Sequence, residues 1–242
     1  MTSTSHESHE AAQAPARPGI AANPAVERAF IARVYGWMAI GLGITGLVAV
    51  ATASDPALMG WIINTPLILM VIAVQLLIVV VLGGAIRRLN AGIATGLFIG
   101  YAALTGLTFS SLFYVYTTES VASVFFVTAV TFGLLSAYGL LTKTDLTWLG
   151  NLALMALVGI ILASSVNLFL GSEVIFWIAT YAGVVVFVIL IASETQQIKR
   201  MAYGLSKDGE LRSKASVIAA MSLYLSFIGL FLRLLRISGK RR

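Results

Sequence analysis

The residues of this sequence that could do chemistry are a few polar side chains inside or beside long apolar stretches. An ionisable group in such a stretch is costly, and is therefore a candidate for function. Glu194 is the acid that qualifies, because it directly follows the apolar run 174–193. Its carboxylate could bind a proton or a metal ion. The polar residues in or beside the stretches are Gln75, Ser110, Ser111, Ser136, Asn167, Glu194, Gln196, Tyr224 and Ser226.

Spacing alone leaves two interpretations of Glu194 open. It is either a functional proton-binding group or a wetted carboxylate at the cytoplasmic end of a helix. Ser226 lies 12 residues beyond Lys214, about 18 Å along a helix, which places it near the middle of a bilayer. A serine there usually bonds the backbone of its own helix. Asn167 is interpreted as a helix-to-helix contact.

Known catalytic motifs are missing from the sequence. It contains no G-x-S-x-G, no H-E-x-x-H and no Walker loop, and no histidine follows position 9. The aspartates are Asp55, Asp145 and Asp208, all in predicted loops, which disfavours a paired-aspartate intramembrane protease. The absence of cysteine removes thiolate catalysis and cysteine metal sites. We expect a protein that is not an enzyme and holds no cofactor.

The elements that position these residues follow from composition. Of the 242 residues 59% are apolar and 11% are charged, whereas a soluble domain has about 25% charged residues. Spanning a bilayer core takes roughly 20 helical residues. The charges leave seven long apolar stretches, at 34–54, 56–86, 89–118, 120–142, 146–172, 174–193 and 215–232. We predict an all-α, polytopic membrane protein, a bundle of seven transmembrane helices.

Further features refine this prediction. Connecting loops are expected at Pro56–Pro66 and Tyr114–Thr118. Gly92, Gly96 and Gly100, spaced four apart, predict close helix packing. Residues 1–22 are predicted to be a disordered cytoplasmic tail, and 23–242 the transmembrane domain, whose first helix starts at Asn23-Pro24. His6 and His9 in the tail are interpreted as solvated.

Loop charges orient the bundle, because Lys and Arg favour the cytoplasmic side. The odd connections each hold a lone acid: Asp55, Glu119 or Glu173. The even connections hold Arg87, Arg88, Lys143, Lys199, Arg200, Lys207, Arg212 and Lys214. The N-terminus and the even connections are therefore predicted to be cytoplasmic. Seven full spans put the basic C-terminal tail outside, and a re-entrant last segment would keep it inside; we favour seven full spans.

Several segments resemble the Bax inhibitor-1/YccA-like family of membrane proteins. They are FIARVYGWMAIGL, IRRLN, GYAALTGLTFSSLFYVY, the block from TFGLLSAYGLLTKTDL to SSVNLFLGS, SETQQIKR and MSLYLSFIGLFLRLLR. The resemblance covers about residues 29–242. It implies six helices around a central seventh and, in some members, a pH-sensitive calcium leak.

The family's leak gate has two aspartates, one in an Asp-Thr-Gln motif and one in a Leu-Tyr-Leu-Asp-Phe motif, with an arginine after helix two. Here the first motif is Glu194-Thr195-Gln196, and the second has Ser226 in place of the aspartate. The resemblance implies that Glu194 pairs with Arg88 or Arg87 at the cytoplasmic mouth of a central cavity, with Ser226 and Tyr224 as polar neighbours. Such a pair favours ionised Glu194. Glu194 alone would bind calcium weakly, because calcium prefers several oxygen ligands.

Two other classes of function stay open. One is a non-conducting interaction protein that modulates membrane proteolysis or a stress response, with 1–22 as a docking segment. The other is a secondary transporter, which is disfavoured because the spans lack paired Gly/Pro interruptions. Short loops and the YccA-like motifs suit a bacterial plasma membrane. The expected partners are the lipid bilayer, calcium and a membrane protease or other membrane protein.

Overall fold

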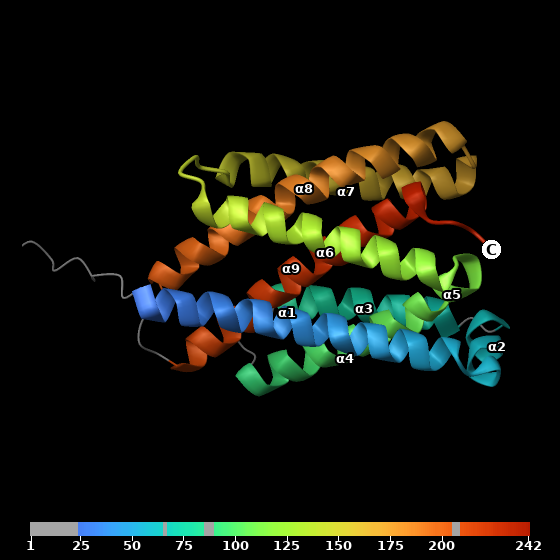
Figure 1. Cartoon of the computed structure of the whole chain (residues 1–242), viewed down its shortest axis with the longest axis horizontal. Helices are drawn as coiled ribbons and strands as arrows, with labels where there is room; N and C mark the ends of the chain where they lie inside the picture. Colours follow the sequence, from blue (N-terminus) through green and yellow to red (C-terminus); the bar gives the residue numbers. More distant parts are fainter. Residues whose placement is uncertain (1–23, 65–66, 85–89, 205–208) are drawn as a thin grey trace, which may run out of the picture.

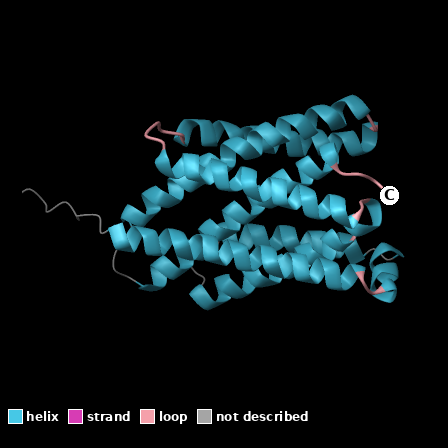
Figure 2. Ribbon diagram, in the orientation of Figure 1, coloured by secondary structure: helices cyan, strands magenta, loops and turns pink. Residues whose placement is uncertain are grey.

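The apolar stretches of the sequence form long helices packed side by side (Figures 1 and 2). The structure, a computed structural model, describes residues 24–64, 67–84, 90–204 and 209–242. Within these residues the elements are α1 (Pro24–Ala53), α2 (Pro56–Asn64), α3 (Leu67–Gly84), α4 (Ala91–Ser110), α5 (Leu112–Val115), α6 (Thr118–Leu141), α7 (Thr147–Leu170), α8 (Glu173–Gly204) and α9 (Gly209–Ser238).

Among the described residues, six apolar segments are long enough to cross a membrane by length and composition: α1, α4 with α5, α6, α7, most of α8, and α9. The second predicted span corresponds to α3, whose apolar part, Ile68–Gly83, is shorter. The 18 residues of the whole helix α3 span about 27 Å, close to the roughly 30 Å of a bilayer core. The described residues thus confirm an all-α polytopic membrane protein.

Helix α9 lies at the centre of the bundle, in contact with α1, α4, α6 and α8. Most of its apolar segment is buried, whereas almost none of α7 is. Leu223, Tyr224 and Leu230 on α9 are completely buried. This arrangement matches the central seventh helix that the family resemblance implies.

The loop predicted at Pro56–Pro66 is wrong, because most of this segment forms the helix α2. Asp55 starts this helix: its Oδ1 accepts hydrogen bonds from the backbone N–H groups of Ala57 (2.9 Å) and Leu58 (3.2 Å). An acid followed by a proline is a common helix start, since the side chain caps and the proline fits the first turn. The sequence therefore contained the signal for α2.

The loop predicted at Tyr114–Thr118 also differs in the structure. A one-turn helix, α5, occupies its first part, and Tyr116 then pairs antiparallel with Arg241 of the C-terminal tail. The backbone N–H of Thr117 donates to the carbonyl of Lys240 (3.1 Å), and that of Arg242 donates to the carbonyl of Val115 (3.0 Å). The end of the chain is thereby fastened to the connection between α5 and α6.

The structure also corrects the predicted glycine contacts. Gly92 and Gly96 are exposed, and a Cβ added at Gly96 or Gly100 would meet no neighbouring atom. Close approaches occur at other glycines instead. A Cβ at Gly106 would lie 2.6 Å from Cβ of Val48 on α1, which shows how closely α1 and α4 pack.

The described connections lie at the two ends of the bundle, on the sides that the loop charges predict. Figure 1 shows the start of α1 and the α6–α7 connection at one end, and α2, α5 and the C-terminus at the other. Helix α9 runs from the first end to the second, so the re-entrant alternative does not describe it. The predicted tail 1–22, Arg87, Arg88 and Asp208 lie outside the described residues.

Candidate functional site

Glu194 lies within a helix rather than at its end. The predicted span 174–193 is extended in the structure, where α8 continues to Gly204, ten residues or about 15 Å beyond Glu194. The apolar segment of this helix reaches Ala202. Glu194 is partly buried, and its neighbours Ser193 and Thr195 are buried. The carboxylate is therefore positioned by helix packing, not by a loop.

Two serines of the central helix hold the Glu194 carboxylate. Oγ of Ser222 donates to Oε1 at 2.7 Å, and Oγ of Ser226 donates to Oε2 at 2.8 Å. These serines stand four residues apart, so they share one face of α9. An ionised carboxylate is an acceptor at both oxygens and suits two hydroxyl donors. We call Glu194, Ser222 and Ser226 the α8–α9 latch.

The two residues after Glu194 contact other elements, because successive side chains on an α-helix point about 100° apart. Oγ1 of Thr195 lies 3.3 Å from the hydroxyl of Tyr35 on α1 and makes a longer 3.5 Å contact with Ser136 on α6. Gln196 donates from Nε2 to the carbonyl of Thr144 (2.7 Å) and accepts at Oε1 from the N–H of Leu146 (2.9 Å). The Glu-Thr-Gln motif thus ties α8 to its surroundings on three sides.

Glycines bring the neighbouring helices close to α8 beside the latch. A Cβ at Gly139 on α6 would overlap the carbonyl oxygen of Ala192. At Gly150 on α7, it would lie 2.6 Å from Oγ of Ser193. Because both contacts involve α8 residues directly before Glu194, they limit where the carboxylate can move.

Tyr224 was predicted as a neighbour of Glu194, and the structure places its hydroxyl elsewhere. That hydroxyl lies 2.7 Å from Oγ1 of Thr45 on α1, and Oγ1 in turn donates to the carbonyl of Ala102 on α4. The Tyr224 ring packs edge-on against Phe98 and Tyr101. Being two residues from each latch serine, Tyr224 faces a different side of α9.

The charge partners of the latch can be stated for the part of the chain that is described. There, ion pairs join Arg200 to Asp145 (2.8 Å) and Lys214 to Glu210 (3.0 Å), so Glu194 has no cationic partner. The predicted partners Arg87 and Arg88 fall in the undescribed segment 85–89. The described residues contain no cluster of three His, Cys, Asp or Glu that could hold a metal ion. Glu194 therefore offers calcium one carboxylate with two hydroxyls.

The α6–α7 connection is fastened to α8 close to the latch. Arg200 donates to Oδ1 of Asp145 (2.8 Å) and to Oγ1 of Thr147 (2.7 Å). Hydrogen bonds from Thr147, together with the Arg200 guanidinium, hold the pKa of Asp145 well below its usual range. Asp145 therefore stays ionised throughout the neutral and mildly acidic range.

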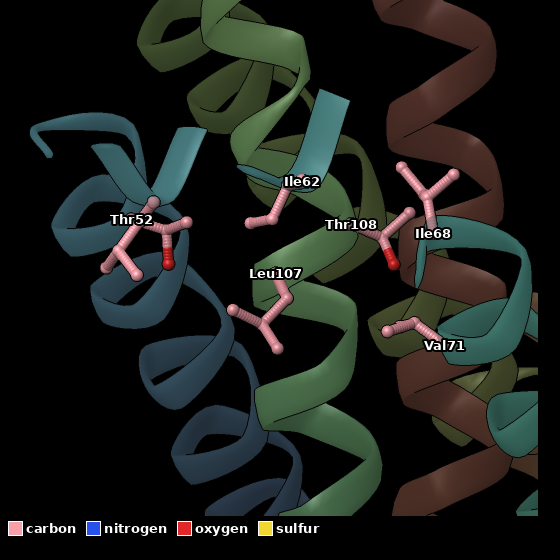
Figure 3. Close-up of a pocket in the computed structure, with 7 residues that line it drawn as sticks. Thr52, Ile62, Ile68, Val71, Leu107 and Thr108 are labelled. Atoms are coloured by element: carbon pink, nitrogen blue, oxygen red, sulfur yellow. The ribbon is translucent and has the colours of Figure 1, made fainter. Parts of the chain in front are cut away.

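The cavity in Figure 3 does not include the predicted site residues. It has a volume of about 150 Å³ and lies between α1, α2, α3 and α4. Thr52 and Thr108 are its polar lining residues, among Leu58, Ile62, Ile68, Val71 and Leu107. Its lining is almost wholly apolar, which suits lipid or side-chain packing rather than ion binding.

Ser222 is the site residue that the sequence reasoning missed. It stands four residues before Ser226 in an apolar helix, and the spacing S-x-x-x-S is the signal that would have found it. Gly139 and Gly150 were missed as well. No sequence signal distinguishes them from exposed glycines, because their roles depend on which face of each helix meets α8.

Comparisons with known proteins agree with this architecture. The family described as inhibitor of apoptosis-promoting Bax1 matches residues 27–242. The chain is 49% identical over 215 residues to the inner membrane protein YbhL of Escherichia coli, covering 88% of this chain and 92% of that protein.

Two further relatives come from other bacteria. An uncharacterized protein of Borreliella burgdorferi is 40% identical over 218 residues, covering 90% of this chain and 94% of its own. An uncharacterized membrane protein of Streptococcus pyogenes is 35% identical over 214 residues, covering 87% of this chain and 92% of its own. With a match that runs from the first long helix to the C-terminus, this chain belongs to the Bax inhibitor family of integral membrane proteins.

Proposed function

We propose that this protein is a pH-modulated cation leak pathway in which the α8–α9 latch is the gate. The observation that carries the proposal is the Glu194 carboxylate, held by two serines of the central helix inside a membrane-spanning segment. A leak of this kind involves no catalysis and no cofactor. The bacterial relatives support a bacterial plasma membrane as its location, with the N-terminus in the cytoplasm.

Protonation of Glu194 supplies the pH response. While the carboxylate is ionised, its two hydrogen bonds are charge-assisted, and such bonds are roughly twice as strong as neutral ones. A proton removes the charge and turns one oxygen into a donor, which weakens the contact between α8 and α9. Acidification should therefore favour the open state.

Calcium is the cation we propose, passing without tight binding. It prefers roughly six to eight oxygen ligands, and the latch supplies one carboxylate and two neutral hydroxyls. Ser226 stands where the family gate has an aspartate, so a second carboxylate is missing. We expect slower calcium flux and a shallower pH response than a gate with two carboxylates would give.

The first test measures calcium entry into lipid vesicles that contain the purified protein and an enclosed calcium dye. We expect faster entry at pH 6 than at pH 8 for the wild type. Glu194→Gln cannot titrate and should give equal rates at both pH values. Ser226→Asp restores a second carboxylate and should steepen the difference.

Asp145→Asn is the matched control, because it removes an acid near the same end of the bundle that is already ionised across this pH range. It should keep the wild-type ratio of rates. A wild-type rate equal to that of protein-free vesicles would contradict the leak and favour a non-conducting interaction protein, for example a partner of a membrane protease. A wild-type pH response in Glu194→Gln would instead contradict the role of the latch.

A further inference from the structure

A second polar site lies near the C-terminal end of α9, between α7, α8 and α9. It is a pocket of about 160 Å³ whose polar lining comes from Ser164 and Asn167 on α7 and Arg233 and Arg236 on α9. Apolar residues of α7 and α8, including Phe176, complete the wall. We call it the arginine pocket. It shares no residue with the latch.

The polar groups of the arginine pocket are hydrogen-bond donors in excess. Neither Arg233 nor Arg236 has a carboxylate partner in the part of the chain that the structure describes. Oδ1 of Asn167 already accepts from the N–H of Ser172 (2.9 Å), which leaves the amide NH₂ group as a donor. Two positive charges and further donors, with no acid in the lining, are the chemistry that binds an anion.

The two guanidinium groups are held in place. Arg233 is partly buried against α8 at a glycine, where a Cβ on Gly183 would lie 2.8 Å from its Nε. Arg236 is exposed and stacks over the Phe176 ring at 5.4 Å. The charges of the two arginines repel each other, so their common placement costs free energy unless an anion lies between them.

The position of the pocket indicates the kind of anion. Arg236 is in the last turn of α9, Asn167 is in the last turn of α7, and Phe176 is in the first turn of α8. All three are therefore at the level where a spanning helix reaches the lipid headgroups. Below this level the outer face of α7 is apolar and open, with Val158 and Leu162 largely exposed.

From this geometry we propose that the arginine pocket binds the phosphate group of an anionic phospholipid. Arg233 and Arg236 contact the phosphate oxygens, Asn167 and Ser164 add hydrogen bonds, and the acyl chains follow the exposed face of α7. Basic pockets between transmembrane helices on the cytoplasmic side bind anionic lipid headgroups, and the same charge chemistry applies to a pocket at the outer end of the bundle. A free phosphate ion has the same chemistry, so the test must separate the two sources.

The test uses the full-length protein in detergent and native mass spectrometry to measure how much lipid it retains. Phosphatidylglycerol should be retained in preference to phosphatidylcholine, whose choline group repels the arginines. Arg233→Gln and Arg236→Gln should each weaken phosphatidylglycerol binding at least about tenfold, as expected for loss of a charge-assisted hydrogen bond. Arg28→Gln changes an exposed arginine at the other end of the bundle and should keep the wild-type affinity.

Inorganic phosphate provides the second arm, read as a shift in the melting temperature of the same protein. Millimolar phosphate should give little stabilisation if the lipid is the ligand. Strong stabilisation by phosphate that both arginine variants lose would overturn the lipid as the source. Equal retention of the two lipids, or wild-type binding by Arg236→Gln, would overturn the site itself; Arg236 is exposed, so this variant should fold even where Arg233→Gln does not.

Discussion

At the scale of single residues, the latch is a carboxylate whose two oxygens each accept one hydrogen bond from the central helix. Because the donors are neutral hydroxyls, the site keeps its shape without a buried counter-charge in the described part of the chain. We expect the contact between α8 and α9 at the latch to depend on pH more than on salt concentration, since it contains no exposed ion pair for salt to screen.

Removing one hydroxyl of the latch should lower stability. We expect Ser222→Ala or Ser226→Ala to reduce the free energy of unfolding by about 1–2 kcal/mol, between the values typical of interhelical bonds in membranes and of bonds to charged groups. The double variant should depart from the sum of the single effects, because both bonds are made to one carboxylate. Unfolding in mixed micelles at pH 8 measures this.

Ser165→Ala is the control for that experiment, since Ser165 is exposed on α7 and bonds only the carbonyl of Ile161 in its own helix. An equal loss of stability in this variant would mean that the latch bonds contribute nothing special.

Single residues also show how far sequence reasoning reaches. Glu194 could be identified because a lone acid beside an apolar run is rare, and the family motif pointed to Ser226. The partner Ser222 and the separate position of Tyr224 depend on the rotation of α9 within the bundle. That rotation is set by the packing of α9 against four other helices, which no local pattern in the sequence encodes.

At the scale of elements, α8 packs closely against α6 and α7. The carbonyl of Ala192 approaches α6 at Gly139, whereas Gly96 on α4 faces open space. Charge placement located most of the helices, because each charge marks where a span ends. It could not tell a buried glycine from an exposed one, since both occur in equally apolar helices.

This contrast gives a prediction about two matched substitutions. Gly139→Ala should lower the free energy of unfolding by about 1–3 kcal/mol, because the new methyl group overlaps the backbone of α8. Gly96→Ala adds the same methyl group without a contact and should be neutral, or stabilising by up to about 1 kcal/mol. Melting temperatures of the two purified variants check this, and equal effects would contradict the described packing of α6 on α8.

At the scale of the whole molecule, the α6–α7 connection, which holds Lys143, lies at one end of the bundle, and the α1–α2 and α5–α6 connections, beside Asp55 and Glu119, lie at the other (Figure 1). This separation follows from loop charges alone and needs no knowledge of how the helices pack. The described part of the chain ends at the same end as α5, so an odd number of crossings relates the start of α1 to the C-terminus.

The orientation can be tested directly, because the chain has no cysteine. We expect Lys143→Cys to react with a membrane-impermeant maleimide only after the cells are permeabilised. Glu119→Cys and Lys240→Cys should react in intact spheroplasts. All three positions are exposed in the structure. Labelling of Lys240→Cys together with Lys143→Cys would contradict the seven-crossing arrangement.

The pairing of the C-terminal tail with Tyr116 has a consequence for how the central helix can move. Because the residues just beyond the C-terminal end of α9 are fastened, we expect α9 to tilt about that end rather than to slide along its neighbours. The displacement grows with distance from the fastened end. Ser222 is 16 residues from Ser238 and Ser226 is 12, about 24 and 18 Å along the helix. A tilt of α9 therefore separates Ser222 from Glu194 first, and Ser226 acts as the last contact to break.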